Sequence, residues 1–560
     1  MQRALELSPT LLTITGLDTG PLAKARRQLD NRSPTGAAQL QVVFQQLQRD
    51  LSAYDPGQLS KNDWINHQSA ELLVRDTLDS FTFGYGDPNA GIAAPYIVSQ
   101  LSGSYRQIPS FLATQHPVRT AEDADAYLSR LGAFATLIDQ ESERVRSDFA
   151  RDVVPPTFVL EASIRQFDAL LASKPDQSEL VLALTKRAAA ANIAGPWEKD
   201  AAAIVDRQVF PALDRQRAIL RAALPHSNAN AGVWDLPEAD RYYRYAISAA
   251  TTTNLPPDEI HHLGLELVGE FSAKADAELR KEGLSQGSVV DRLAVLRNRA
   301  DQLYPNTDEG RTELLKDLEK ALARVNAVLP AWFGSLPKSR VDIVRMPPSI
   351  ETGASGATYQ PPALDGSRPG LFSINLRDLN EWPRFELPTL VFHEAVPGHH
   401  LQNALMTEAP GLPLLRRMPI YSGYSEGWAL YAEQLADEMG LYRDDRLARL
   451  GYLASMLFRA TRLVVDTGIH SKRWSRAESI AYMSKSLGGN LGSIEREVDR
   501  YCVQPGQALS YMLGWKVWTG ARDAAQKRLG GKFDIKRFHD AGLLSGSMPL
   551  DVLAKVLASV

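Results

Sequence analysis

Helical periodicity dominates the first 330 residues of the chain. Apolar side chains recur at intervals of three and four residues, as in LLKDLEKALARV (314–325), and this spacing places them on one face of an α-helix. Thr120 with Asp123 forms a capping pair before a segment that runs to about Phe149, and Pro257 marks another helix start. We therefore expect an N-terminal lobe built from packed helices.

The pattern changes between roughly residues 340 and 378. VDIVRM (341–346) and LFSINL (371–376) predict short strands on either side of a stretch rich in Gly and Pro. Helical patterns then return, and we expect helices at about 384–405, 424–439, 442–467 and 475–486, and from near Pro505 onwards.

These patterns predict a mainly α fold with a small β insertion. The sequence contains no internal repeat and no linker long enough to separate independent domains. We therefore expect one large helical domain over residues 1–560. Its parts are an N-terminal helical lobe at about 1–335, a small β segment at about 340–378 and a C-terminal lobe with the metal-site helices at about 384–560.

Charge and hydropathy narrow the classes of partner. The chain has 62 Lys and Arg residues against 66 Asp and Glu residues, a net charge of -4, which offers no basic surface for nucleic acid. No apolar run reaches the roughly 18 residues that a membrane helix needs, and the first residues lack the pattern of an export signal. We expect a soluble protein without a membrane partner. It would be cytoplasmic, or periplasmic or secreted if a signal peptide has been removed.

The segment that indicates chemistry is HEAVPGHH, residues 393–400. Cys502 is the only cysteine, so a metal site would have to use His, Asp or Glu. Three of the ten histidines lie within these eight positions. In a common zinc-peptidase helix, two histidines four residues apart bind the ion, and the Glu after the first polarises the attacking water. His393 and Glu394 fit the start of that pattern.

The second histidine departs from the pattern. His399 and His400 follow His393 by six and seven residues, about 9 or 10.5 Å along a straight helix, too far for two nitrogens bound at about 2.0–2.1 Å to one zinc. Pro397 cannot continue the helical hydrogen bonds, and Gly398 permits unusual backbone angles. We expect a two-residue bulge that puts His399 at the ligand position and leaves His400 as an alternative ligand or a neighbour of the site. Without a metal, the three histidines would only cap or line a kinked helix.

A third ligand is expected in YSGYSEGWALYAEQL, residues 421–435. Glu426 and Glu433 lie seven residues apart on one helical face. Either carboxylate would complete a two-His, one-Glu set around one zinc ion with an open position for water. The other would orient a ligand histidine from behind. For Glu433, a solvated position on an amphipathic helix is the competing interpretation.

Several motifs together resemble a known family. HEAVPGHH, YSEGWALYAEQ and RYCVQPGQALSYMLG, with SPTLLTITGLD and DGSRPGLFSINL, resemble the bacterial family known as domain of unknown function 885 over most of the chain. That family is similar to helical gluzincins such as carboxypeptidase Taq, angiotensin-converting enzyme and neurolysin. The resemblance implies a helical metallopeptidase-like fold with a deep cleft and one zinc ion at its floor. It implies His393, His399 and Glu426 as ligands and Glu394 as general base.

The same resemblance implies residues that contact the substrate. A tyrosine often stabilises the oxyanion in gluzincins, and Tyr511 and Tyr424 are the candidates. In these relatives a strand edge along the cleft pairs with the peptide backbone, and the matching segment is Gly370 to Leu376. The candidate substrate contacts are Tyr359, Phe372, Asn375 and Arg500. Arg500 is a candidate for a different reason: an exopeptidase must bind a terminal charge, and this arginine is either a bidentate clamp for a terminal carboxylate or a surface residue at a helix end.

The predicted function is a zinc-dependent peptidase, an oligopeptidase or exopeptidase that cleaves short peptides with Glu394 as the base. Two other functions remain open. GYSEG (423–427) fits the G-x-S-x-G elbow of serine hydrolases, with Ser425 as nucleophile, although that elbow needs a preceding strand and a parallel sheet. The chain could also be a non-catalytic peptide-binding protein with a peptidase-like cleft, which would not need a carboxylate beside a ligand histidine.

Overall fold

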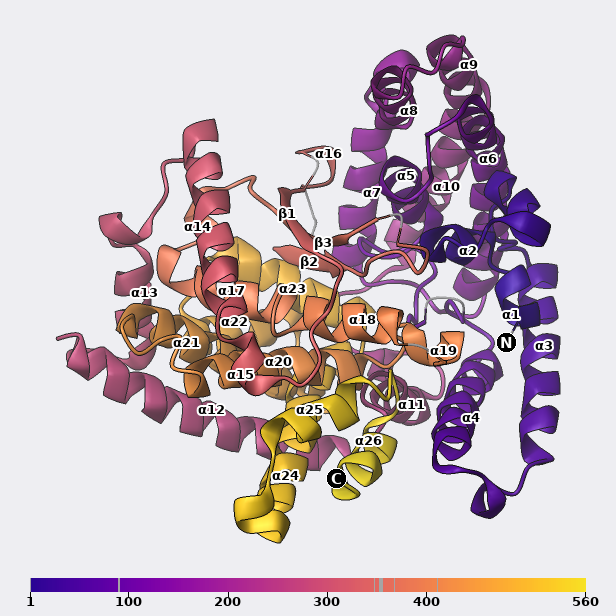
Figure 1. Cartoon of the computed structure of the whole chain (residues 1–560). Helices are drawn as coiled ribbons and strands as arrows, with labels where there is room; N and C mark the ends of the chain where they lie inside the picture. The colour runs from indigo at the N-terminus through magenta and orange to yellow at the C-terminus, as the bar shows by residue number, and fades with distance from the viewer. Residues whose placement is uncertain (1, 89–90, 347, 352–355, 367, 410) are drawn as a thin grey trace.

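The computed structural model describes residues 2–88, 91–346, 348–351, 356–366, 368–409 and 411–560. Helices form most of this structure, and a small three-stranded sheet lies among them (Figure 1). The mainly α fold with a small β insertion, predicted from the apolar pattern, is confirmed. In the described part of the chain, no helix combines the length and the hydropathy needed to cross a membrane.

The helices before the sheet are α1 Gln2–Glu6, α2 Pro9–Thr15, α3 Pro34–Ser52, α4 Lys61–Thr82, α5 Ser104–Thr114, α6 Ala121–Phe149, α7 Thr157–Leu171, α8 Glu179–Ala190, α9 Trp197–Ile204, α10 Phe210–Ala223, α11 Ala239–Thr251, α12 Pro257–Lys281, α13 Val289–Arg297, α14 Asp308–Asn326 and α15 Leu329–Trp332. The strands are β1 Val341–Arg345, β2 Ala357–Gln360 and β3 Gly370–Ile374. The remaining helices are α16 Pro348–Glu351, α17 Leu387–Glu394, α18 His399–Glu408, α19 Leu414–Arg417, α20 Ser422–Glu438, α21 Arg446–His470, α22 Arg476–Leu487, α23 Leu491–Val503, α24 Ser510–Leu529, α25 Ile535–Leu543 and α26 Leu550–Ala558.

Local capping signals set several of these bounds. The Thr120 side chain accepts a hydrogen bond from the Asp123 amide at the start of α6, as the capping pair predicts. α6 ends at Phe149, where the sequence analysis expected its end. Ser475 and Glu478 cap each other at the start of α22. The helix expected over about 384–405 is instead two helices, α17 and α18, for reasons described with the site below.

The sheet has the strand order β1-β3-β2, with β1 parallel and β2 antiparallel to β3. The sequence predicted β1 and β3 but not β2, which has only four residues and lies in the Gly- and Pro-rich stretch. Because β2 pairs with β3, Gly370 to Leu376 is not the sheet edge that the resemblance implied. β3 is the central strand, with Phe372 paired to Ile343 on one side and Tyr359 on the other. On the side of β3 where Tyr359 pairs, the outer strand of the sheet is β2.

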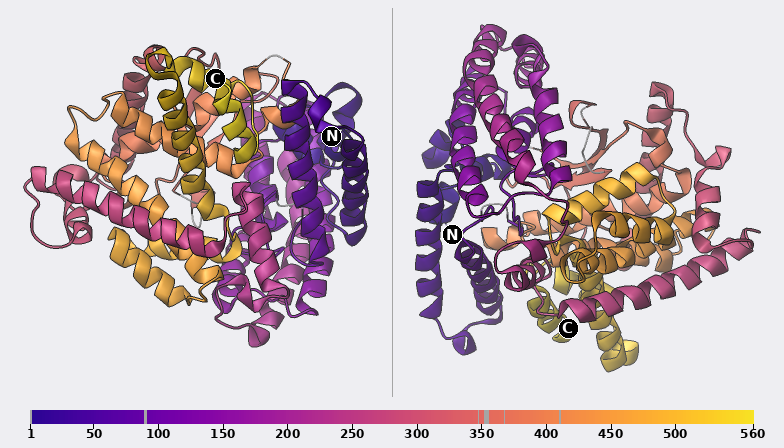
Figure 2. Two further views of the ribbon diagram at one scale, coloured as in Figure 1. Left: turned by 90° about the horizontal axis from the view of Figure 1, so that it is seen from below. Right: turned by 180° about the vertical axis from the view of Figure 1, so that it is seen from behind.

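Two large hydrophobic cores and one small cluster hold the helices of the described structure together. The smaller core lies within α5 to α10, which stand together at one side of the molecule (Figures 1 and 2). The larger core joins α17, α18, α20, α21 and α24 with α11 and α12. The long helix α12 packs along α21 and crosses the face of the C-terminal helices (Figure 2). The C-terminal helices that carry the site are therefore supported by helices from the N-terminal part of the chain.

Candidate metal centre

Three helices position the histidines and glutamates of the HEAVPGHH and YSEGW motifs. α17 ends with His393 and Glu394, α18 begins at His399, and α20 carries Glu426 and Glu433. Between α17 and α18 the chain leaves the helical path over residues 395–398, where the Val396–Pro397 peptide bond is cis. The expected two-residue bulge is thus a complete break between two helices.

Gly398 allows the two helices to meet closely. A Cβ atom on Gly398 would lie 2.0 Å from the carbonyl oxygen of His393 and 2.4 Å from that of Phe392. The indole Nε1 of the fully buried Trp428 donates hydrogen bonds to the carbonyl oxygens of Pro397, at 2.9 Å, and Gly398, at 3.3 Å. The break is therefore held in place by α20, the helix that also carries the two glutamates.

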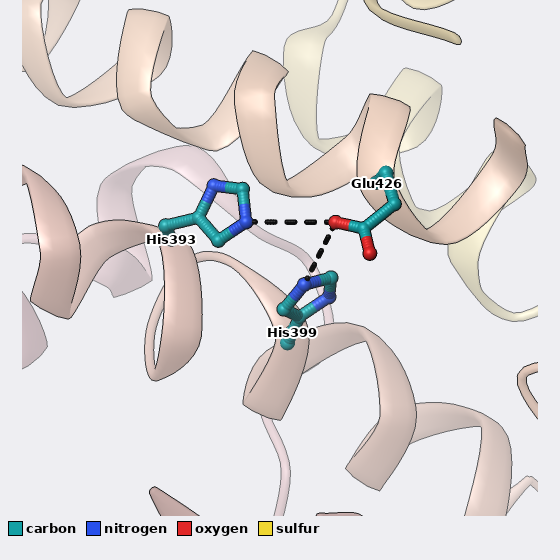
Figure 3. Close-up of side chains that lie close together, drawn as sticks. All are labelled: His393, His399 and Glu426. Atoms are coloured by element: carbon teal, nitrogen blue, oxygen red, sulfur yellow. Dashed lines mark ion pairs between the residues drawn. The ribbon is translucent and has the colours of Figure 1, made fainter. Parts of the chain in front are cut away.

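The side chains of His393, His399 and Glu426 converge on one point (Figure 3). Glu426 Oε2 lies 3.6 Å from His393 Nε2 and 3.3 Å from His399 Nε2. Two ligand atoms about 2.0–2.1 Å from a tetrahedral zinc ion lie about 3.3 Å apart. Glu426 Oε2 is also buried without a hydrogen-bond donor, which is unusual for a carboxylate oxygen. This donor set fits one zinc ion, with a fourth position for water.

The electrostatics of these residues favour a bound cation. Burial opposes protonation of His393, but Glu426 and Glu433 raise the pKa of His393 to about 9. Burial would raise the pKa of Glu426, yet His399 and His393 hold the pKa of this carboxyl well below its usual range. The pKa of buried Glu433 is lowered as well, chiefly by Arg459 and His393. Both carboxylates therefore stay ionised, and a divalent cation between the side chains would offset their charge.

Each of the two facing histidines has a partner on its other ring nitrogen. His393 Nδ1 donates to Glu433 Oε1 at 2.8 Å, and Thr389 Oγ1 donates to Glu433 Oε2 at 2.7 Å. His399 Nδ1 lies 3.4 Å from Ser425 Oγ, a longer and weaker contact. With Nδ1 protonated and a metal ion in place of the Nε2 proton, the Nε2 lone pair of each histidine would point to the centre of the group, which is the arrangement of a metal ligand. The sequence analysis did not name Thr389. Its position one helical turn before His393 is the signal that could have identified it as a neighbour of this histidine.

His400 points away from this group. Its Nε2 donates to the Ser339 carbonyl at 2.9 Å, so its Nδ1 accepts from the Tyr359 hydroxyl at 3.1 Å. Burial lowers the pKa of His400, which favours this neutral form. The structure therefore groups His399, and not His400, with His393 and Glu426. His400 holds Tyr359, whose ring lies nearly parallel to that of His399, with centroids 6.2 Å apart.

The group lies in a cavity of about 1030 Å³. Glu394 lines this cavity together with His393, His399 and Glu426. One wall is formed by β2, with Tyr359, and another by side chains of α21, α23 and α24. Glu394 follows His393 directly in the chain and lines the same cavity.

The two candidate oxyanion tyrosines occupy very different positions. The Tyr511 ring lies nearly parallel to that of His393, with centroids 6.2 Å apart, and it lines the cavity. Burial, and then the charge of Glu426, raises the pKa of Tyr511, so the phenol keeps its proton. Tyr424 is fully buried, and its hydroxyl donates to the Gly542 carbonyl of α25 at 3.0 Å. The structure contradicts a catalytic role for Tyr424, because this hydroxyl faces the core.

Two predicted substrate contacts lie outside the cavity. Phe372 is fully buried in the larger core, on the face of β3 opposite to Leu371 and Ser373, which line the cavity. Asn375 donates from Nδ2 to the Glu351 carbonyl at 2.8 Å and does not line the cavity. The prediction for Phe372 was wrong because alternation along a strand shows which side chains share a face, but not which face meets the cavity. The prediction for Asn375 was wrong because this residue follows the end of β3 and its side chain bonds to Glu351 instead.

Arg500 does line the cavity, and two arginines that the sequence analysis missed join it. Arg459 and Arg462 project from α21 into the same space, with their guanidinium carbons 5.8 and 4.4 Å from the centre of the Tyr511 ring. Their spacing of three residues on one helix could have indicated a shared polar face. The sequence alone did not show that this face meets α23.

Ser425 lies within α20 and not at a strand-to-helix turn. No strand precedes it in the described residues 411–421. The glycines of GYSEG have a packing role instead, because α24 crosses α20 at this point. A Cβ on Gly427 would lie 2.4 Å from Gly514 Cα, and one on Gly514 would lie 2.1 Å from the Gly423 carbonyl oxygen. The structure therefore lacks the elbow geometry that the serine-hydrolase interpretation requires.

Comparisons with known proteins agree with this architecture. The model of a family described as "Bacterial protein of unknown function (DUF885)" matches residues 9–557. The solved structure of a provisionally named lipoprotein from Colwellia psychrerythraea is 32% identical, covers 99% of this chain and 96% of that chain, and superposes with a TM-score of 0.94. A provisionally named lipoprotein of unknown function from Shewanella oneidensis is 16% identical, with coverage of 99% and 97% and a TM-score of 0.72.

A more distant match carries less weight. Metallocarboxypeptidase 1 from Trypanosoma cruzi is 14% identical over 81% of this chain and 96% of that chain, and its TM-score of 0.27 is too low to indicate a shared fold. No curated protein sequence matches the chain.

Proposed function

The chain belongs to the DUF885 family of bacterial proteins of unknown function, and we propose that it is a zinc-dependent peptidase that hydrolyses peptide bonds of short peptides. One observation carries this proposal. The Nε2 atoms of His393 and His399 and the Oε2 atom of Glu426 meet at ligand spacing within a cavity of about 1030 Å³ that Glu394 also lines. This set of two histidines, one carboxylate and an adjacent base matches metal-assisted hydrolysis.

The side chains around the ion have distinct roles in this proposal. Zinc held by His393, His399 and Glu426 would supply a Lewis acid that lowers the pKa of a water molecule toward about 7. Glu394 takes the proton of that water and returns it to the leaving amine. Glu433 holds His393 in the tautomer that leaves Nε2 free.

Tyr511 is the proposed donor to the substrate carbonyl. Its ring lies beside His393, and the pKa shift keeps its hydroxyl protonated. A donor in this position would stabilise the carbonyl oxygen as that oxygen gains charge.

The dimensions of the cavity favour short peptides as substrates. Its volume is at the upper end of the range for small-molecule sites, about 300–1,000 Å³, and is too small for a folded protein. β2 is an outer strand of the sheet and lines the cavity. We therefore assign to β2, in place of β3, the role of pairing with the peptide backbone by strand addition.

The main test compares metal content with hydrolysis. Purified protein should hold about one zinc ion per chain and should lose hydrolysis of short peptides in the presence of a strong chelator. Glu394→Gln should keep its zinc while turnover falls about 10²–10⁴-fold. Activity that is indifferent to the chelator, in protein without a stoichiometric metal, would contradict the proposal.

Ser425→Ala separates the two hydrolase mechanisms. This variant loses only the 3.4 Å contact to His399 Nδ1, so hydrolysis should stay within about tenfold of wild type. An inactive Ser425→Ala together with an active Glu394→Gln would favour a serine hydrolase. Tight peptide binding by zinc-loaded protein that cleaves none of the peptides would favour the non-catalytic binding protein.

The proposed compartment is periplasmic or secreted. The likeness to the Colwellia psychrerythraea protein, which is named as a lipoprotein, supports this compartment over the cytoplasm. Fractionation of the native cells, followed by immunodetection of the protein, tests the assignment, and detection only in the cytoplasmic fraction would exclude it.

A further inference from the structure

Three arginines and one carboxylate lie on the cavity wall formed by α21 and α23. Arg459, Arg462 and Arg500 all line the cavity. Glu497 accepts hydrogen bonds from Arg462 Nη2 at 3.1 Å and Arg500 Nη2 at 2.9 Å. Among the described residues, Glu497 is the only acid within ion-pair distance of any of the three. Arg459 donates from Nη1 to Ser455 Oγ and has no such partner.

These arginines have donors that the protein leaves unpaired. Arg459 Nε, Arg462 Nη1 and Arg500 Nε are buried without a hydrogen-bond acceptor, and the Arg462 residue is only 5% exposed. The Oε2 atom of Glu497 already accepts three donors, since the Tyr501 hydroxyl also donates to it at 2.9 Å. Buried donors of native proteins are nearly always paired. Three unpaired N–H groups with a surplus of positive charge therefore indicate a ligand that supplies oxygen acceptors.

The arginine wall lies close to the metal group. The Arg462 guanidinium carbon is 4.4 Å from the centre of the Tyr511 ring, and that ring is 6.2 Å from the His393 ring. Tyr511 therefore lies between the two. A peptide advances about 3.3–3.6 Å per residue, so one to three residues beyond the scissile bond would reach the arginines.

We propose that Arg459, Arg462 and Arg500 bind a carboxylate of the peptide substrate. The carboxyl terminus fits the spacing, so that the enzyme would remove one to three residues from the C-terminal end. Guanidinium N–H groups form charge-assisted hydrogen bonds with carboxylate oxygens, and each of the three arginines has one such unpaired donor. The inference rests on the proposed peptidase function. The second source of a carboxylate is an acidic side chain on the same part of the peptide.

A binding experiment tests the site without requiring turnover. The zinc-loaded Glu394→Gln protein is titrated calorimetrically with acetylated tri-alanine that has a free carboxyl terminus, with the same peptide as an amide, and with an amidated peptide that ends in glutamate. The free acid should bind at least about tenfold more tightly than the tri-alanine amide, because the hydrogen bonds to it are charge-assisted. Adding Arg459→Gln should bring the two affinities close together.

The choice of variants controls for folding. Arg459 has no acid partner, so its replacement breaks no ion pair. Arg449→Gln is the matched control, because Arg449 lies on the same helix, pairs with Asp437 and Glu278, and does not line the cavity. This control should keep the full difference between acid and amide. Since Arg459 also lowers the pKa of Glu433, zinc content and unfolding temperature are measured for each variant.

Each outcome separates the carboxylate site from the peptidase. Equal affinity for free acid and amide in folded, zinc-loaded protein would overturn the carboxylate site, even if the wild-type protein cleaves peptides. Tight binding of the glutamate amide would support the site and identify the acidic side chain as the source. If the protein binds the free acid more tightly than the amide but the wild type cleaves none of these peptides, the carboxylate site would be supported and the peptidase function would be excluded.

Discussion

Gly398→Ala tests whether the break between α17 and α18 builds the metal centre. The added Cβ would lie 2.0 Å from the His393 carbonyl oxygen and 2.4 Å from that of Phe392, whereas real Cβ atoms stay at least 3.0 Å from such atoms. The two segments must therefore separate by about 1 Å, the difference between these distances. Both obstructing atoms belong to the backbone, so no side-chain rotation can relieve the contact.

The shift would be passed directly to a metal ligand. Gly398 precedes His399, and metal–ligand distances tolerate deviations of only about 0.2 Å. Overpacking of this kind typically costs about 1–3 kcal/mol of stability. Zinc affinity should fall by at least about 10–100-fold, the loss expected when the support of a metal ligand is removed.

The assay is a zinc titration against a competing chromophoric chelator, with thermal unfolding of the metal-free protein in parallel. Gly520→Ala is the matched control, because Gly520 lies within α24 and nothing is within 4 Å of its added Cβ. That variant should keep wild-type zinc affinity and gain about 0.5–1 kcal/mol of stability. Wild-type zinc affinity in Gly398→Ala would refute the reasoning that the close approach at Gly398 positions His399.

His399→Ala should empty the zinc site while His400→Ala should leave it filled, because only His399 faces the metal group, and metal analysis of the two purified variants decides between them. Glu433→Gln should weaken zinc binding about 10–100-fold by removing the charged acceptor of His393 Nδ1, and an unchanged affinity in the same titration would exclude that role. Burial raises the pKa of Asp466 to about 7, so the folded state favours the protonated acid. Its contribution to stability is complete below the ordinary pKa of 3.8 and is lost as the pH rises through about 7. In Asp466→Asn the unfolding free energy, measured by denaturant titration, should therefore fall less between about pH 4 and 7 than in wild type, and an unchanged pH profile would contradict this assignment.

Short-range signals predicted most of the helical architecture. The capping pair at Thr120 and Asp123 and the capping box at Ser475 and Glu478 mark helix starts in the structure. These signals work because a cap satisfies backbone groups within three residues of itself. Pro397 and Gly398 likewise act on the backbone over only a few residues. For this reason the spacing of the motif was enough to identify the histidines that the structure brings together.

Other expectations failed because they depended on contacts between distant segments. β2 was missed since four residues among Gly and Pro carry little strand signal, and its pairing turned β3 from a supposed edge into the central strand. Phe372 and Tyr424 carry suitable chemistry but point into the core. A pattern along one segment identifies the faces of a helix or strand, while only packing against another segment decides which face meets the cavity.

By itself the sequence determined the helical class, the departure from a straight helix between His393 and His399 and the identity of the residues that are close together along the chain, because these depend on backbone sterics and hydrogen bonds over a few positions. Only the tertiary structure placed Glu433 behind His393 and turned Arg459 and Arg462 of α21 toward Arg500 of α23. These arrangements follow from how α20, α21 and α23 pack in a shared core, and that packing is a property of the whole chain.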